Sequence, residues 1–118
     1  MQILLVHGGG RKNRQIKQWI ESCYPGSHIT ICHNITQAME YISVVGVHIN
    51  LCFTDIQMRD GTGIQVVRAL REANWRAKIV FISDTDAYAM DAWRLGVNDY
   101  LLEPLTLDSI RHTWESCS

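Results

Sequence analysis

The sequence has little net charge, few prolines and no long apolar run. Eleven basic and twelve acidic side chains leave a formal net charge of -1, so electrostatics gives no reason to expect nucleic acid or an anionic membrane as a direct partner. The apolar runs are too short to cross a bilayer, and the first residues show no signal-peptide pattern. Because no repeat, low-complexity tract or linker is visible, residues 1–118 are expected to form one cytoplasmic domain.

Cysteine is also sparse, and its spacing argues against a disulfide framework. The four cysteines are scattered, at positions 23, 32, 52 and 117, which favours reduced thiols in a cytosolic protein. His28, Cys32 and His33 lie close in sequence, but their spacing matches no zinc template. On a strand, Cys32 and His33 would also point to opposite faces. The sequence therefore predicts no metal site.

Short apolar segments alternate with amphipathic helices along the chain. Strands are predicted at residues 2–6, 28–32, 49–54, 78–82 and 99–102. One helical stripe has apolar residues at positions 16, 19, 20 and 23, and a second begins after Asn34 as N-cap, with Gln37 at the capping-box position. Further helices are predicted around residues 64–70, at 87–95 before Gly96, and after Thr106, with Trp114 facing inward.

This alternation predicts an α/β fold with an open parallel sheet that helices cover on both faces. In such a sheet, sites form beyond the carboxyl ends of the strands, where the strand order reverses. The residues that follow the predicted strands are therefore the candidate site residues: His7, Gly8, Asp55, Ser83, Asp84 and Glu103.

Three segments at these strand ends resemble the receiver domains of bacterial response regulators. Residues 54–63 (TDIQMRDGTG) look like the phosphoacceptor loop, with Asp55 followed by Met58 and Gly63. Residues 81–83 (FIS) resemble the fourth strand with its terminal Ser/Thr, and residues 89–104 are similar to the segment that precedes the family's Lys-Pro. The compact spacing of positions 83 to 96 is most similar to LytTR-type transcription regulators. The resemblance covers the whole chain and implies a flavodoxin-like (βα)5 three-layer sandwich with strand order 2-1-3-4-5.

The resemblance also implies roles for individual residues. In active receivers an aspartate takes a phosphoryl group, and catalysis rests on positioning and charge neutralisation. That position matches Asp55, while Ser83 matches the hydroxyl that donates to the phosphoryl group. Tyr100 matches the aromatic that rotates between exposed and buried positions. Active receivers hold Mg²⁺ with an acidic pair after the first strand and pair the phosphoryl group with a lysine after the fifth.

The sequence departs from this pattern at most of the charged positions. His7 and Gly8 replace the acidic pair, and Glu103 replaces the lysine. Arg59 replaces a proline, and Asp84 replaces a small residue. Exchange of Lys for Glu changes the local charge by two units, and one unit pair at about 4 Å is worth roughly 4 kcal/mol at an effective dielectric of 20. A lone histidine such as His7 is expected to be a hydrogen-bonded loop residue.

The leading hypothesis is therefore a degenerate, non-enzymatic receiver that regulates a transcription output through protein contact or dimerisation. Its carboxylates Asp55, Asp84 and Glu103 are expected to crowd together with no cation among them, which disfavours phosphorylation. This hypothesis requires no cofactor. The alternative is a working phosphoacceptor, in which Asp55 takes a phosphoryl group from a histidine kinase with the help of Mg²⁺.

Two further expectations concern surfaces, and one concerns the backbone. The resemblance implies a partner surface on the fourth helix, fifth strand and fifth helix, where Trp93 and Trp114 lie, although their helical spacing favours the core. A third hypothesis is a small-anion sensor at the Gly8-Gly9-Gly10 turn before a basic helix, but glycines tolerated beside a solvated basic face are the favoured reading. The Glu103–Pro104 bond is expected to be cis, as the family's Lys-Pro commonly is.

Overall fold

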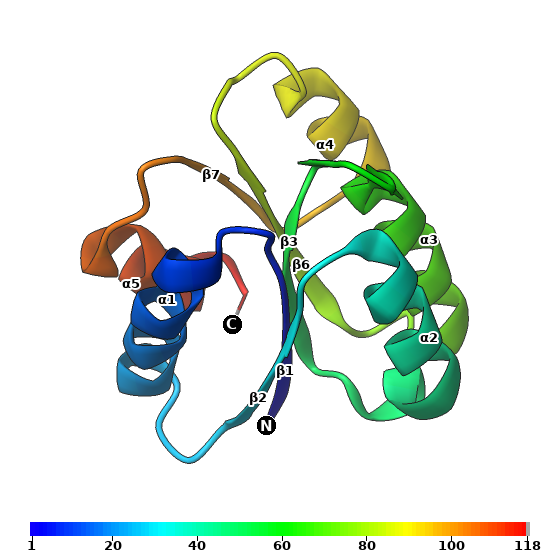
Figure 1. Ribbon diagram of the computed structural model, residues 1–118, viewed down its shortest axis with the longest axis horizontal. Helices are drawn as coiled ribbons and strands as arrows, with labels where there is room; N and C mark the ends of the chain where they lie inside the picture. Colours follow the sequence, from blue (N-terminus) through cyan, green and yellow to red (C-terminus); the bar gives the residue numbers. More distant parts are fainter. Residues whose placement is uncertain (118) are drawn as a thin grey trace.

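A five-stranded parallel sheet forms the centre of the molecule (Figure 1). The computed structural model describes residues 1–117. Along the sheet the strands lie in the order β2-β1-β3-β6-β7, which confirms the expected order 2-1-3-4-5 when the sheet strands are counted along the chain. Their bounds are β1 Gln2–Val6, β2 His28–Cys32, β3 Leu51–Asp55, β6 Lys78–Ser83 and β7 Asp99–Leu102.

Helices cover both faces of this sheet, which confirms the three-layer sandwich. α1 (Gly10–Cys23) and α5 (Leu107–Ser116) lie together on one face (Figure 1). α2 (Ile35–Val45), α3 (Gly63–Ala73) and α4 (Ala89–Leu95) lie on the other. Among residues 1–117, no helix combines the length and the apolar character needed to cross a bilayer.

The core consists of two apolar clusters, one on each face of the sheet. Alternate residues of the central strands enter opposite clusters, as the two-residue period of a strand requires. Leu4 and Phe81 pack with α2 and α3, while Leu5 and Phe53 pack with α1 and α5. Because both faces are buried, the strands read as continuous apolar runs instead of alternating ones.

Several boundaries differ from the sequence expectation because local hydrogen bonds end the elements elsewhere. The third strand of the sheet begins at Leu51, since residues 46–48 form a 3-10 helix, η1 (Gly46–His48), which the Ile49 amide closes by donating to the Gly46 carbonyl. The expected loop at 57–63 contains two short antiparallel strands, β4 (Gln57–Met58) and β5 (Gly61–Thr62). α4 begins two residues later than expected.

Helix caps follow the predicted chemistry. The Asn34 side chain accepts from the Gln37 amide (2.8 Å), and the Thr106 hydroxyl accepts from the Ser109 amide (3.1 Å). The Gln37 side chain, however, accepts from the His33 amide and not from the Asn34 amide, so the expected capping box is displaced by one residue.

Two tryptophans contradict the expectation that helical spacing places them in the core. Trp93 on α4 is 77% exposed, and Trp114 on α5 is 52% exposed. The ring of Trp114 packs instead on Tyr24 at the end of α1, with ring centroids 5.2 Å apart. The inward positions on α5 are Ile110 and Thr113, and the Thr113 hydroxyl lies 2.7 Å from the Tyr24 hydroxyl. Helical periodicity identified the buried stripe, but the buried residues are Ala92 and Thr113, each one position before the tryptophan that was expected there.

Candidate functional site

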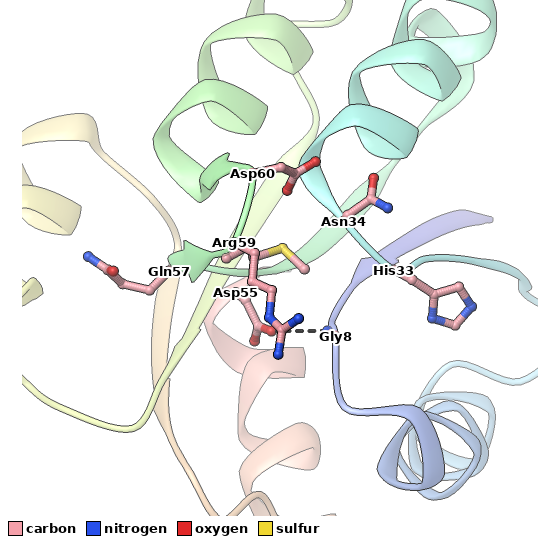
Figure 2. A pocket seen from close by; sticks show the side chains of 8 residues that line it. Gly8, His33, Asn34, Asp55, Gln57, Arg59 and Asp60 are labelled. Atoms are coloured by element: carbon pink, nitrogen blue, oxygen red, sulfur yellow. Dashed lines mark hydrogen bonds between the residues drawn. The ribbon is translucent and has the colours of Figure 1, made fainter.

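The predicted site lies beyond the carboxyl ends of the parallel strands, beside an open cleft of about 760 Å³. Figure 2 shows the residues that line this cleft, with Asp55 and the Gly8 backbone joined by a hydrogen bond. They come from the ends of β1, β2 and β3 and from the loop after β3, and are Gly8, His33, Asn34, Asp55, Gln57, Met58, Arg59 and Asp60.

Asp55 ends the central strand β3, and backbone contacts fix it there. Its Oδ2 accepts a hydrogen bond from the Gly8 amide (3.3 Å). Gly63, eight residues later, starts α3 directly against the Asp55 backbone, and a Cβ at position 63 would collide with the Asp55 carbonyl oxygen. A glycine is therefore needed for α3 to pack against the end of β3.

His7 is the buried residue of the site, with only 3% of its surface exposed. Its Nδ1 lies 2.7 Å from Asn13 Oδ1, and the Asn13 amide nitrogen donates to the His7 carbonyl oxygen (2.8 Å). Because a carbonyl only accepts, this second bond fixes the orientation of the Asn13 amide. His7 Nδ1 then carries the hydrogen and donates to Asn13. The Gly9 amide lies 3.1 Å from the same Nδ1 but could donate to it only in the other tautomer.

The other ring nitrogen of His7 faces two carboxylates. His7 Nε2 lies 3.6 Å from Asp55 Oδ1 and 3.7 Å from Glu103 Oε1. The carboxyls of Asp55 and Glu103 are thus brought to one imidazole. Asp84, which was expected to crowd with them, is exposed. The contact of both carboxylates with the buried His7 ring was not part of the sequence expectation.

Burial dominates the electrostatics of Asp55 and raises the pKa of its carboxyl from 3.8 to about 6. The imidazole of His7 and the Gly8 amide act in the opposite direction and lower this pKa, while the negative charges of Glu103 and Asp84 raise it further. Asp55 Oδ1 is also a buried side-chain oxygen that finds no hydrogen-bond donor within residues 1–117. The site therefore holds a carboxylate that is incompletely stabilised.

Ser83 and Tyr100 lie near the site but are engaged with the loop after β6. The Ser83 hydroxyl accepts from the Thr85 amide (3.2 Å). The Tyr100 hydroxyl donates to the Thr85 carbonyl oxygen (2.6 Å), and its half-buried ring packs against the apolar cluster on the α2–α3 face. Both side chains proposed as switch residues thus contact the same residue, Thr85.

The glycine turn that follows β1 makes its hydrogen bonds and close contacts within the protein. The Gly8 amide donates to Asp55 and the Gly10 amide to the Gly8 carbonyl (3.0 Å). A Cβ at Gly9 would collide with the imidazole of His7. Gly9 therefore makes room for the buried ring, and this gives the glycines a role that needs no bound anion.

The turn after β7 brings Glu103 to the site. The Glu103–Pro104 bond is cis, which confirms the prediction. The Glu103 amide donates to the Ser83 carbonyl oxygen (2.8 Å), so the backbone at this position continues the pairing of β6 with β7.

Two residues that position the site were missed from the sequence. Asn13 orients His7, and it lies on the same helical face as the buried Ile16 and Ile20; a polar residue in that stripe was the available signal. Asp60 accepts from the amides of Ile35 (2.9 Å) and Thr36 (2.8 Å) and so ties the loop after β3 to the start of α2. No sequence signal linked these distant segments.

The side chains present do not fit the Mg²⁺ that active receivers use. Mg²⁺ requires oxygen ligands in near-octahedral geometry, but the acidic pair is replaced by the His7 ring and by Gly8, which has no side chain. His28, Cys32 and His33 are not brought together as ligands. Within residues 1–117, the one group of three potential metal-ligating side chains is His7, Asp55 and Glu103.

Comparisons with known proteins agree with this architecture. The Enterococcus faecalis sensory transduction protein LytT is 22% identical over 118 residues, which are 100% of this chain and 48% of that protein. The Bacillus cereus LytT protein is 31% identical over 64 residues, which are 54% of this chain and 26% of that protein. The match therefore covers about half of the length of the Enterococcus faecalis protein and about a quarter of the Bacillus cereus protein.

Solved structures and a family model match almost the whole chain. A response regulator receiver domain protein from Clostridium thermocellum superposes with a TM-score of 0.83 at 18% identity, covering 98% of this chain and 92% of that chain. A two-component response regulator from Clostridium difficile gives a TM-score of 0.82 at 24% identity, covering 99% and 94%. These likenesses show the fold. The profile of the response regulator receiver domain matches residues 3–115, and the chain belongs to that family.

Proposed function

We propose that this receiver domain works without phosphorylation, as a cytoplasmic module that regulates a transcription output by binding a protein partner or a second copy of itself. The family membership supports a role in two-component signalling. The names of relatives support a regulatory output: LytT is a sensory transduction protein, and the Klebsiella pneumoniae CitB protein, 33% identical over 67 residues, is a transcriptional regulatory protein. CitB is matched over 55% of this chain and 29% of its own length.

The observation that carries this proposal is the environment of Asp55. Its carboxyl faces a buried imidazole and the carboxyl of Glu103, where an active receiver has a lysine. A phosphoryl group on Asp55 would add negative charge beside Glu103. At about 4 Å, each unit of like charge costs roughly 4 kcal/mol at an effective dielectric of 20, before screening by solvent. An anionic phosphoryl donor that approaches Asp55 would meet the same repulsion from Glu103.

The positions that would hold Mg²⁺ strengthen this argument. Phosphoryl transfer needs a cation to neutralise charge on the transferred oxygens. His7 is held in place by Asn13, and its ring fills the space beside Asp55. Neither His7 nor Gly8 offers a carboxylate, so the reaction would lose both the metal and the lysine that normally neutralise the charge.

The test of phosphorylation is intact mass spectrometry after incubation with acetyl phosphate and Mg²⁺. We expect no adduct on the wild-type chain under conditions that label an ordinary receiver, which serves as the positive control. Asp55→Asn is the negative control. A phosphoryl adduct on the wild type that is absent from Asp55→Asn would overturn the proposal.

A working phosphoacceptor is the alternative, and two retained residues favour it. Asp55 stands at the end of β3 beside an open cleft, and the buried Ser83 ends the neighbouring strand β6. A histidine kinase would then be the donor. The mass experiment decides between the two functions, because only this alternative predicts an adduct that depends on Asp55.

The proposed partner surface is formed by α4, β7 and α5 at one edge of the sheet. Large apolar side chains are exposed on all three elements, namely Met90, Trp93, Leu102 and Trp114. Single exposed apolar residues are ordinary, but a contiguous apolar patch marks an interaction surface. Sedimentation velocity of the wild type and Trp93→Asp tests self-association: a dimer lost in the variant supports homodimerisation, and monomers in both direct the search to a different protein.

A further inference from the structure

Three potential ligand atoms converge at the carboxyl end of the sheet without hydrogen-bonding one another. They are His7 Nε2, one carboxylate oxygen of Asp55 and one of Glu103, and all lie within 4.8 Å of each other. His7 is only 3% exposed, and its Nε2 lies 3.6 Å from Asp55 Oδ1 and 3.7 Å from Glu103 Oε1. Asp55 Oδ1 finds no hydrogen-bond donor within the described residues.

The hydrogen bonds of His7 with Asn13 leave its Nε2 facing the two carboxylates. Because Asn13 is oriented by its bond to the His7 carbonyl oxygen, His7 Nδ1 is the donor to Asn13 Oδ1. In the neutral ring, Nε2 is then an acceptor. Metal-binding histidines have this arrangement, in which the second ring nitrogen donates to a carbonyl or carboxylate that fixes the ring. In that state three acceptors face one another, and a metal ion bound among them would remove their repulsion.

The two separations that involve His7 suit a metal ion better than a shared proton. A hydrogen bond between these atoms would bring them to about 2.7–3.2 Å. Tetrahedral Zn²⁺, with ligands at about 2.0–2.2 Å, places neighbouring ligand atoms about 3.3–3.6 Å apart. The distances of 3.6 and 3.7 Å from His7 Nε2 to the two carboxylates are close to the second value.

We propose that His7, Asp55 and Glu103 bind a divalent transition-metal ion of the Zn²⁺ class, with Asn13 positioning the histidine. One imidazole and two carboxylates are a nitrogen and oxygen set that suits Zn²⁺ better than Mg²⁺, which prefers oxygen ligands alone. The charges balance, since two carboxylates and a neutral ring neutralise a dication. Three protein ligands leave one position open. The three ligand residues line a cleft of about 410 Å³, together with the basic residues Arg11 and Lys12, and this cleft is the path by which an ion would enter.

The metal site does not rest on the proposed function. A chain that binds Zn²⁺ could still be phosphorylated when the metal is absent, and an unphosphorylated chain need not bind Zn²⁺. The mass experiment is run with Mg²⁺ alone and the metal titration without a phosphoryl donor, so either proposal can fail while the other stands.

Calorimetric titration of the untagged, EDTA-treated and desalted chain with Zn²⁺ tests the site. We expect saturation at one ion per chain, with an affinity that millimolar Mg²⁺ does not change. Glu103→Gln and His7→Gln each reduce the affinity by at least about tenfold, and Asn13→Ala by about 10–100-fold through the orientation of His7. Asp86→Asn and His48→Gln remove an exposed carboxylate and an exposed histidine outside the cluster and leave the affinity unchanged.

Substitution by Co²⁺ identifies the ligands even if His7→Gln fails to fold. The Co²⁺ spectrum of the wild type should show the intense visible bands of four-coordinate geometry and no thiolate charge-transfer band, and Glu103→Gln should alter it. No Zn²⁺ binding, a thiolate band, or equal affinity in Glu103→Gln and wild type would each overturn the proposal. Displacement of Zn²⁺ by equimolar Mg²⁺ would do the same.

Discussion

The interior of the sheet and the carboxyl ends of its strands follow different rules in this domain. Within the strands, apolar side chains pack on both faces and are almost completely buried, as Leu4, Phe53 and Phe81 are. At the carboxyl ends of the strands, at positions 7, 55 and 103, charged and polar groups meet at distances too long for hydrogen bonds. The strand interiors keep the pattern that the fold requires, while the strand ends have lost the pattern that phosphorylation requires.

This difference teaches that the fold and the chemistry of the strand ends depend on separate residues. Burial of apolar area stabilises the sheet by about 25 cal/mol per Å², and none of that area comes from the carboxylates of Asp55 or Glu103. The strand ends were therefore free to change without loss of the fold. Four substitutions test this separation by their effect on the free energy of unfolding.

The largest effect is expected in the interior. Phe53→Ala removes a fully buried ring between the sheet and the α1–α5 face, and should lower the free energy of unfolding by about 3–5 kcal/mol through lost transfer energy and the cavity left behind. Urea denaturation followed by circular dichroism measures it. If the protein does not fold, Ile82→Val, expected to cost about 0.5–1.5 kcal/mol, replaces it. A loss of stability smaller than the change caused by both Asp55→Asn and Glu103→Gln would contradict the idea that fold and strand-end chemistry depend on separate residues.

A smaller, pH-dependent effect is expected at Asp55. Its pKa rises from 3.8 to about 6 in the folded protein, mainly through burial. The folded state therefore holds the proton more tightly than the unfolded state, and the wild type loses stability as the pH rises from about 4 to 6. His7, Glu103 and Asp84 are the ionisable groups that act on this carboxyl.

Asp55→Asn removes that titration. In EDTA, the stability of the variant relative to the wild type should rise by about 1–3 kcal/mol between pH 4 and pH 7, since one pKa unit corresponds to about 1.4 kcal/mol. Urea denaturation at a series of pH values measures this difference. A difference that stays constant or falls with pH would show that burial does not destabilise the charged carboxylate.

A third, weaker effect is expected at Glu103, which is 25% exposed in its side chain. Glu103→Gln removes a negative charge that raises the pKa of Asp55, so this pKa should fall toward its ordinary value. The free energy of unfolding at neutral pH should change by less than about 1 kcal/mol. An NMR titration of the Asp55 carboxyl carbon follows the pKa. A rise in that pKa would contradict the contact between the two carboxyls.

The smallest effect on stability is expected at the surface. Trp93 is 77% exposed, so Trp93→Ala should change the free energy of unfolding by no more than about 0.5 kcal/mol. Thermal denaturation of the two proteins at low concentration compares them. A larger loss would place this side chain in the core of the domain and remove it from the proposed partner surface.

Much of the fold could be predicted because apolar periodicity is a local property. The strands at 2–6 and 28–32 coincide with β1 and β2, and the caps at Asn34 and Thr106 were identified from short motifs. The exposure of Trp93 and Trp114 was not predictable in the same way. Helical spacing shows which residues share a face, but where the buried stripe ends depends on the width of the neighbouring elements.

The candidate site was predicted in its membership but not in its geometry. Asp55 and Glu103 were identified because parallel strands end at one edge of the sheet. The inward turn of His7 was missed. It depends on a glycine at position 9 that leaves room for the ring and on Asn13, which α1 carries to the His7 backbone.

The sequence by itself determined the order of strands and helices, the residues at the strand ends and the cis Glu103–Pro104 bond, which the resemblance to receivers implied. These features follow from local patterns and from motifs of a few residues. Only the tertiary structure decided that His7, Asp55 and Glu103 face one another and that Asn13 fixes the histidine tautomer. The physical reason is that these side chains come from the carboxyl ends of three different strands and from a helix, so their contacts exist only after the sheet and α1 have packed together.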